Sequence, residues 1–365
     1  MPTQGAPETR MAIVHEWINA YAGSEQVFEA LAQIFPTADL FALSREPDIS
    51  LELGGRPIRT TFLDHAFTRR HRAIALPLMP AAWRALGKSR YELVLSSHHA
   101  FAHANRLADG GTHLCYVHSP ARYLWSPDVD RRGAGLFMRP GAAVLRRYDL
   151  AASRRVTAYA ANSSAVASRI KDFWHREATV IHPGVRIEYF SQATNVSPAR
   201  DYVLGAGRWI AYKNMPRVIE AASIAGMPVK IAGSGPDKDR IVAAASAAAV
   251  PVELIESPSD EQLRDLYRNA ACLVFPTVED FGIVPVEAQA AGTPVVAIAA
   301  GGALDTIRDG ETGYLVSEPT SGALAERILA VGQIKAPDCQ RNAARFTHAE
   351  FASRIREWVD GIAPR

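Results

Sequence analysis

The sequence predicts an α/β protein built from two doubly wound parallel sheets. Ten short β-rich runs alternate with helical stretches, and several runs are almost continuously apolar, as in parallel strands that helices cover on both faces. The chain has 365 residues, which suits two domains of ordinary size. An irregular stretch containing Pro183, Gly184 and Pro198 separates the first five runs from the other five, and we expect the domain boundary there.

The runs follow one another in a regular order along the chain. The predicted strands are 11–14, 38–43, 91–96, 112–117 and 156–160, then 202–206, 229–232, 252–255, 272–276 and 295–298. The clearest helices between them are 215–225, 260–270 and 284–291. A terminal amphipathic helix over 349–359 has Phe351, Ile355 and Trp358 at helical spacing. We therefore expect domains over 1–185 and 186–346, followed by a helical segment over 347–365.

Composition excludes several classes of protein. With 48% hydrophobic and 21% charged residues, the chain is not a disordered protein, a collagen or a coiled coil. No apolar run approaches the roughly 18 residues that a transmembrane helix needs, and the first ten residues have no signal-peptide pattern and predict a short disordered leader. Cys115, Cys272 and Cys339 are too far apart for a metal motif or a disulfide framework, so a reducing cytoplasm is the simplest compartment.

Charge is unevenly distributed along the chain. The net charge is +2 overall, but residues 1–185 carry a net +6 and the remaining residues a net −4. A basic first half indicates an anionic partner, either a phosphate-bearing substrate or a membrane surface, or else only a solvated charged face. Basic patches also bind nucleic acid, but no reader motif or set of stacking aromatics is present, so no nucleic-acid partner is expected.

The strongest chemical signal is the segment EDFGIVPVE, which follows a predicted strand. Glu279 lies on the loop after the strand, and Glu287 lies on the next helix. The start of that helix suits a phosphate, whereas the two carboxylates suit the hydroxyl groups of a ribose and a hexose. Arg208 and Lys213 follow another strand, where two cations can neutralise a diphosphate and its developing charge without a metal.

The segment EDFGIVPVE resembles the E-x7-E signature of family 4 retaining glycosyltransferases of the GT-B fold. The runs HEWINAYAGSEQVFEAL, YVHSPARYLW, HPGV, GAGRWIAYKN, IAGSGP and GGALDTIRDGETGYLV resemble further motifs of that family in the same order. The resemblance implies two Rossmann-like domains facing a central crevice, with the terminal helix returning to the N-terminal domain. It also implies that 1–185 binds the acceptor and 186–346 the nucleotide sugar.

The resemblance assigns roles to individual residues. Glu287 would hold the ribose, Arg208 and Lys213 the diphosphate, and Glu279 the sugar hydroxyls. His118 would contact the donor sugar from the N-terminal domain. The expected catalytic residues are His118, Arg208, Lys213 and Glu279. Further donor contacts are expected at Gly23, Gly233, Glu256, Phe281, Gly282, Ile283 and Glu287. No cofactor and no metal are expected.

Several N-terminal features complete the expected site. Gly23 permits close backbone approach, and Ser24 is the predicted N-cap of the helix that follows. Ser97 and His98 are expected on the acceptor side. The neighbouring histidines His98, His99 and His103 are not expected to bind metal, because their spacing does not place three imidazoles on one face and no carboxylate is adjacent in sequence. Asp128 and Asp130 form a D-x-D that is interpreted as a solvated loop.

A stretch with basic ends and an apolar centre follows residue 68. Leu76, Leu78, Met79 and Trp83 could insert at a bilayer interface while the arginines meet anionic headgroups. The alternative is an ordinary helix closing the core. The predicted edge toward the acceptor and the inner-membrane surface comprises Arg69, Arg70, Arg72, Trp83 and Arg84. A second basic set, Arg131, Arg132, Arg139, Arg146 and Arg147, is expected on the same face.

The functional prediction is a retaining hexosyltransferase in the cytoplasm, peripheral at the membrane. The segments HEW, SSHHAFA and HSPARYLW resemble bacterial O-antigen and exopolysaccharide mannosyltransferases, which favours GDP-mannose and a polyprenyl-diphosphate-linked saccharide acceptor. UDP-glucose, UDP-galactose and UDP-GlcNAc remain alternative donors. A non-catalytic sugar-nucleotide-binding scaffold, an epimerase and a phosphorylase are the competing classes.

Overall fold

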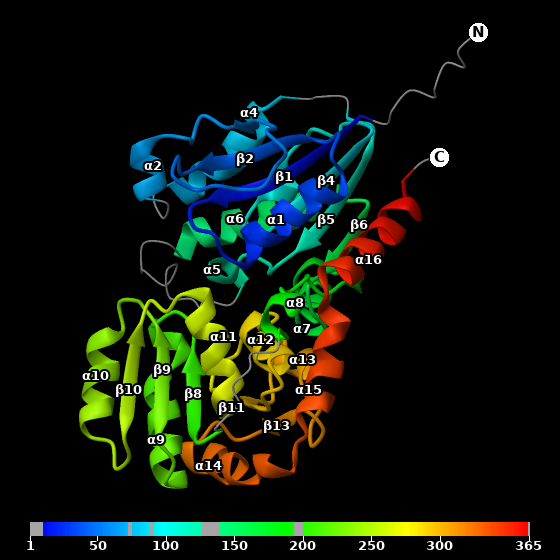
Figure 1. Ribbon diagram of the computed structural model, residues 1–365. Coiled ribbons are helices and arrows are strands. Elements are labelled where there is room, and N and C mark those ends of the chain that lie inside the picture. Colours follow the sequence, from blue (N-terminus) through cyan, green and yellow to red (C-terminus); the bar gives the residue numbers. More distant parts are fainter. Residues whose placement is uncertain (1–9, 72–74, 88–90, 126–138, 193–199, 364–365) are drawn as a thin grey trace. The chain divides into compact units, whose positions relative to one another are not determined.

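The computed structural model describes residues 10–71, 75–87, 91–125, 139–192 and 200–363 (Figure 1). The chain forms two compact units. The first comprises the chain up to His182 together with Phe351–Arg365, and the second comprises Pro183–Glu350. The chain therefore passes from one unit to the other at 182–183 and at 350–351, close to the limits expected from sequence.

The first unit is built on a parallel sheet of seven strands within the described residues, in the order β3-β2-β1-β4-β5-β6-β7. Its strands are β1 (Met11–Ile18), β2 (Asp39–Arg45), β3 (Ile58–Thr60), β4 (Leu93–His98), β5 (Thr112–Val117), β6 (Ala158–Ala161) and β7 (Ala178–Val180). Every pairing between neighbours is parallel. The carboxyl ends of β1, β4 and β5 therefore lie next to one another at one edge of the sheet.

Helices cover both faces of this sheet. Alternate residues of β1 point to opposite faces, so Val14 packs in one core with Trp83 and Ile13 packs in another with Phe28. Phe351 of the terminal helix belongs to the same core as Ile13. The helices are α1 (Gly23–Ile34), α2 (Ala66–Arg70), η1 (Leu76–Leu78), α4 (Met79–Ala85), η2 (Ala102–Ala104), α5 (Arg122–Trp125), α6 (Arg139–Ser153), α7 (Ser164–Trp174) and α16 (His348–Asp360).

The second unit repeats the plan with a parallel sheet of six described strands, in the order β10-β9-β8-β11-β12-β13. They are β8 (Tyr202–Ala206), β9 (Val229–Gly233), β10 (Val252–Glu256), β11 (Ala270–Phe275), β12 (Val295–Ile298) and β13 (Gly313–Val316). Its helices are α8 (Ile187–Phe190), η5 (Ala211–Lys213), α9 (Met215–Ala225), α10 (Lys238–Ser246), α11 (Asp260–Asn269), α12 (Ile283–Ala290), α13 (Ala303–Thr306), α14 (Ser321–Ala330), η6 (Val331–Gln333), α15 (Ala336–Ala343) and η7 (Ala344–Phe346).

The predicted fold class is confirmed, and a strand is present at each of the ten predicted positions. Sequence reasoning did not predict β3, β7 and β13 as strands. All three are outermost strands of their sheets, and each has only three or four residues. Such short strands are stabilised by pairing with one neighbour, and their residues carry little periodic signal of their own.

Candidate functional site

In the second unit, the predicted donor residues gather at the carboxyl ends of adjacent parallel strands. Arg208 and Lys213 follow β8, Gly233 ends β9, and Glu279 follows β11. These strands are neighbours in the order β9-β8-β11. Crevices at the carboxyl ends of strands are the usual ligand sites of doubly wound sheets.

Lys213 and Glu279 form a close ion pair. Nζ of Lys213 lies 2.6 Å from Oε1 of Glu279, and the two side chains are 9% and 19% exposed. The pair joins the residue predicted to bind phosphate to the residue predicted to bind a sugar hydroxyl. A lysine ammonium has three donors, so it can hold this carboxylate and still donate to an anion. The pairing also fixes the direction of a flexible side chain.

Glycine makes room for Lys213. Gly207 has φ +131°, which side-chain-bearing residues rarely adopt, and a Cβ there would lie 3.1 Å from Nζ of Lys213. Gly233 has φ +145°, and a Cβ on it would fall only 1.8 Å from the carbonyl oxygen of Gly207. The turns after β8 and β9 therefore pack backbone against backbone, which no other residue type allows.

The loop that carries Glu279 is held by two consecutive glycines. The amide of Gly302 donates to the carbonyl oxygen of Glu279 at 2.9 Å. A Cβ on Gly301 would lie 2.3 Å from that same oxygen, and one on Gly302 would lie 2.2 Å from the carbonyl oxygen of Phe281. Sequence reasoning noted these glycines only as part of a resemblance and missed this role, although two adjacent glycines after a strand are themselves a signal of close approach.

Helix α12 begins directly after this loop. Gly282 is its N-cap with φ +86°, and Ile283 is its first residue. Phe281 is buried against Phe346, with ring centroids 5.6 Å apart, so the loop is anchored by packing as well as by hydrogen bonds. The first amides of a helix have no partner inside the helix, which leaves them available to an anion.

Glu287 lies one turn further along α12. The buried hydroxyl of Tyr267 donates to its Oε2 at 3.0 Å. Burial raises the pKa of Glu287 to about 7, against the opposing effect of the Tyr267 hydrogen bond. At neutral pH, this carboxyl is therefore close to its titration midpoint, and its second oxygen can accept from a hydroxyl when ionised.

The other donor candidates are more exposed. Arg208 is exposed, and no ion pair is recorded for it within the described part of the chain. Glu256 ends β10 opposite Gly233 and pairs with Lys238 at the surface. The amide of Ser257 donates to the carbonyl oxygen of Gly233 at 2.9 Å, so the backbone after Glu256 lies against the second glycine turn.

In the first unit, the predicted residues lie along the carboxyl ends of β1, β4 and β5. His118 follows β5 and is half-buried, and its Nε2 lies 2.8 Å from Oγ of Ser97 at the end of β4. Ser97 Oγ also lies 3.0 Å from Nδ1 of His15 on β1. Ser97 is completely buried, so its predicted place on the acceptor side is wrong, and it contacts His118 instead.

The first glycine loop differs from the prediction in one detail. Helix α1 begins at Gly23 with Ala22 as its N-cap, and no side chain caps it. Ser24 therefore lies inside the first turn, where its hydroxyl donates to Oε2 of Glu25 at 2.8 Å. The predicted N-cap role of Ser24 is wrong, because the helix starts two residues earlier than the serine would require.

His98 is also buried, which makes its predicted acceptor role wrong. Two carboxyl groups lie beside it that sequence spacing did not reveal. Its Nδ1 lies 2.9 Å from Nδ1 of His103 and 3.5 Å from Oε1 of Glu16, and Nε2 of His103 lies 3.3 Å from Oδ1 of Asp149. Burial raises the pKa of Glu16 and of Asp149 to about 7.

This cluster is the candidate for a metal centre among the described residues, since His98, His103 and Asp149 bring potential ligand atoms within 4.8 Å of one another. The short contacts of His103 use different ring nitrogens, one toward His98 and one toward Asp149. Ligands of a single ion would instead turn one atom each toward a common point. The arrangement fits a buried hydrogen-bond chain better than a metal site.

Comparison with known proteins identifies the class of this chain. HepE of Anabaena in complex with UDP superposes with a TM-score of 0.72, at 17% identity, over 96% of this chain and 100% of that chain. Sucrose-phosphate synthase of Thermosynechococcus elongatus has a TM-score of 0.72 at 20% identity, over 96% and 98% of the two chains. Residues 23–189 match the model "Glycosyltransferase Family 4", and residues 187–345 match "Glycosyl transferases group 1". The two matches together span residues 23–345, so each half of the chain is similar to a glycosyltransferase family, and the fold is that of the GT-B type.

Curated relatives agree with this class. D-inositol 3-phosphate glycosyltransferase of Streptomyces avermitilis is 29% identical over 302 residues, which are 74% of this chain and 64% of that protein. The enzyme of the same name from Streptomyces scabiei is 43% identical over 91 residues, 25% of this chain and 20% of that protein. The chain thus aligns with less than two thirds of the length of these relatives.

The predicted apolar residues largely do not form the predicted membrane edge. Trp83 is 0% exposed and packs in the core with Leu76 and Met79, so its predicted insertion into a bilayer is wrong. Leu78 is exposed, as are Phe62 and Phe67. Amphipathic spacing cannot tell an inward apolar stripe from an outward one.

Only some of the arginines of this predicted edge are available to contact anionic lipid headgroups. Arg69 pairs with Asp64 at 2.7 Å and with Glu46 at 3.4 Å, which offsets its charge. Arg70 is exposed, and the guanidinium of Arg84 stacks over the Tyr148 ring at 4.9 Å.

No helix in the described part of the chain is long and apolar enough to cross a membrane. Several predicted features lie outside the described residues: Arg72, Arg131, Arg132, Asp128, Asp130, Pro198 and the leader over 1–9.

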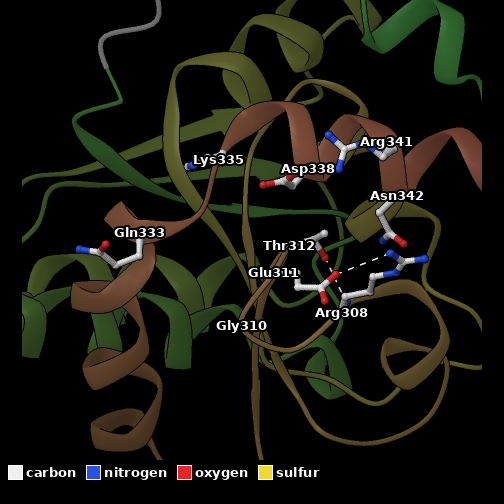
Figure 2. A pocket seen from close by; sticks show the side chains of 9 residues that line it. All are labelled: Arg308, Gly310, Glu311, Thr312, Gln333, Lys335, Asp338, Arg341 and Asn342. Carbon is white, nitrogen blue, oxygen red and sulfur yellow. Dashed lines mark hydrogen bonds and ion pairs between the residues drawn. The ribbon is translucent and has the colours of Figure 1, made fainter.

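A surface pocket of about 340 Å³ lies elsewhere in the second unit (Figure 2). Its charged side chains are largely paired with one another, Arg308 with Glu311 at 3.6 Å and Arg341 with Asp338 at 2.9 Å. None of the predicted donor residues lines it. The lining residues are Arg308, Gly310, Glu311, Thr312, Gln333, Lys335, Asp338, Arg341 and Asn342.

Proposed function

We propose that this glycosyltransferase moves a hexosyl group from a nucleoside-diphosphate sugar to a saccharide acceptor, with retention at the anomeric carbon. The observation that carries the proposal is the 2.6 Å pair between Lys213 and Glu279, with Glu287 on the helix that follows. A fixed cation, a hydroxyl-accepting carboxylate and a second carboxylate match the three parts of such a donor: diphosphate, hexose and ribose.

The roles follow from charge and geometry. Lys213 and Arg208 stabilise the diphosphate as it departs, since the negative charge on it grows in the transition state. Glu279 accepts hydrogen bonds from the hexose, Glu287 accepts them from the ribose, and the amides at the start of α12 meet a phosphate. Two cations can supply the neutralisation that other transferases obtain from a divalent ion, so the proposed reaction needs no metal or other cofactor. The leaving phosphate would itself accept the acceptor proton.

The donor we favour is GDP-mannose, with a polyprenyl-diphosphate-linked saccharide as acceptor. The support is the resemblance of HEW, SSHHAFA and HSPARYLW to bacterial surface-polysaccharide mannosyltransferases. An alternative donor is UDP-glucose, because HepE was crystallised with UDP and with UDP-glucose. An alternative acceptor is a phosphorylated cyclitol, since the curated relatives are named for inositol 3-phosphate.

We further propose that the protein works in the cytoplasm at the membrane surface, where a lipid-linked acceptor would be presented. The exposed Phe67 and Arg70 on α2, rather than Trp83, would provide the contact. Replacing both with serine should reduce sedimentation with anionic vesicles and leave binding of the nucleotide unchanged. Equal sedimentation of the variant and the wild type would reject this contact.

The test of the function is a titration with GDP, GDP-mannose, UDP and UDP-glucose, followed by donor turnover with and without acceptor. Lys213→Ala should reduce turnover by at least about 10²-fold, the scale of one lost charge-stabilising donor. Lys230→Ala is the matched control, because Lys230 pairs with Glu253 on the neighbouring strands and touches no predicted donor residue. Equal turnover of the two variants would refute the role of Lys213, and turnover lost in a chelator would refute the metal-free reaction.

A further inference from the structure

Three residues that come from three different strands form one hydrogen-bonded row in the first unit. His15 lies within β1 in register with Ser97, which is next to the last residue of β4, and His118 follows β5; these three strands are neighbours in the sheet. The Ser97 hydroxyl is between the two imidazoles, 3.0 Å from Nδ1 of His15 and 2.8 Å from Nε2 of His118. His15 and Ser97 are completely buried, whereas His118 is only half-buried.

The hydrogen-bond protons of this row can be arranged in only two ways. A serine hydroxyl has a single proton to donate and accepts on its lone pairs. Ser97 therefore donates to one ring and accepts from the other. The direction of the row decides which nitrogen of a neutral His118 carries the proton.

The tautomer of His15 determines which way the hydrogen bonds of the row point. Desolvation by burial holds the pKa of His15 well below its ordinary value, so its ring is neutral and has one N–H. Its Nε2 is buried and has no hydrogen-bond partner in the described part of the chain. An orphaned N–H is rarer in protein interiors than an acceptor without a donor. The N–H of His15 is therefore at Nδ1, where Ser97 accepts it.

The tautomer of His15 therefore also determines the tautomer of His118. Since Ser97 accepts from His15, its own proton goes to Nε2 of His118, and the ring proton of His118 is on Nδ1. We propose that His15 and Ser97 are positioning residues that hold His118 as the Nδ1–H tautomer, so that it acts toward the donor sugar as a hydrogen-bond donor. The inference rests on the proposed function only in assigning the donor sugar as the partner of His118.

Packing keeps the row in register. The His15 ring stacks on Phe28 of α1 with centroids 4.9 Å apart, which fixes its plane. The backbone amide of His118 donates to the carbonyl oxygen of His98 at 2.8 Å, and the side-chain amide of Asn162 donates to the carbonyl oxygen of His118 at 3.1 Å. The backbone on both sides of His118 is therefore held.

Nitrogen NMR on the full-length protein labelled with ¹⁵N-histidine tests the inference at about pH 8, where an unperturbed imidazole is neutral. His118→Asn assigns the signals of His118. We expect the wild type to show a protonated Nδ1 and a bare Nε2. Ser97→Ala and His15→Phe should each shift His118 toward the Nε2–H form or a mixture, and Ser97→Thr should retain the wild-type tautomer. A wild-type His118 in the Nε2–H form, or an unchanged tautomer in Ser97→Ala, would overturn the inference.

Ser96→Ala is the matched control. Ser96 precedes Ser97 on β4, is equally buried, and contacts Nε2 of His113 at 2.8 Å rather than His118. This variant should change the signals of His113 and leave those of His118 as in the wild type. A change at His118 as large as in Ser97→Ala would mean that any buried cavity disturbs the ring, which would overturn the specific role of Ser97.

Steady-state kinetics separate this inference from the proposed function. Ser97→Ala should lower kcat by about threefold to tenfold, the scale of one hydrogen bond, and leave KM for the donor nearly unchanged. A changed tautomer with unchanged kcat would support the positioning role and refute the contact between His118 and the donor sugar. Thermal unfolding of each variant verifies that the fold is retained.

Discussion

Removal of the Tyr267 hydroxyl tests the chemistry of Glu287 most directly. Tyr267 is completely buried and donates to Oε2 of Glu287 at 3.0 Å, so Tyr267→Phe removes one donor without admitting water. A hydrogen bond to a charged group contributes about 1.5–3 kcal/mol, and about 1.4 kcal/mol corresponds to one pKa unit. The pKa of Glu287, already about 7, should therefore rise by about one to two units in the variant.

The assay is nucleotide affinity as a function of pH. A ribose hydroxyl donates to the ionised carboxylate, so affinity should increase with pH through about 7 in the wild type. In Tyr267→Phe the midpoint should move upward, and affinity near pH 7.5 should fall by about threefold to twentyfold and recover at higher pH. Calorimetric titration with GDP or UDP between about pH 6 and pH 9 measures the midpoint directly.

Tyr202→Phe is the matched control for this experiment. Tyr202 is also buried in the second unit, and its hydroxyl donates to the carbonyl oxygen of Leu266 at 2.7 Å rather than to a carboxylate. It should lower stability without moving the pH midpoint of binding. An unmoved midpoint in Tyr267→Phe, or an equal shift in both variants, would refute the reasoning.

Further predictions concern stability. Gly302→Ala places a Cβ 2.2 Å from the Phe281 carbonyl oxygen, so it should lower the melting temperature and nucleotide affinity together, whereas Gly322→Ala, with open space around it, should lower neither. Trp83→Ala should cost about 3–5 kcal/mol of unfolding free energy in a denaturant titration, and a loss below about 1 kcal/mol would contradict its place in the core. Asp149 has its pKa raised from 3.8 to about 7 by burial, so folding stability is lost as pH rises through that window. Asp149→Asn should reduce that loss by up to about 4 kcal/mol, and an unchanged pH profile would show that the carboxyl does not titrate there.

Much of the fold could be predicted from sequence because parallel strands covered on both faces leave a local signature. Runs such as 202–206 and 295–298 are almost entirely apolar, and the structure has strands there. The three-residue strands β3 and β7 leave no such signature. For the apolar stretch around Trp83, the alternative of an ordinary helix closing the core is the one that the structure has, because its apolar side faces the core and not a bilayer.

The candidate site was predictable to the extent that it depends on strand order. Gly233 ends a strand and Arg208, Lys213 and Glu279 each follow one, and parallel pairing brings such positions to one edge. The contacts among them were not predictable. Nothing in the spacing of Gly301 and Gly302 shows that they press on the loop of Glu279, because that approach depends on how two loops pack.

The sequence by itself determined the fold class, ten of the strands, the clearest helices and the residue types available at each strand end, because these depend on local periodicity and on short motifs. Only the tertiary structure decided which side chains meet. Tyr267 reaches Glu287 from another helix, Asp149 lies beside His103 from 46 positions away, and Ser97 joins His15 to His118 across three strands. Burial depends on tertiary packing, and the pKa of Glu287 and the position of the proton on His118 depend on burial.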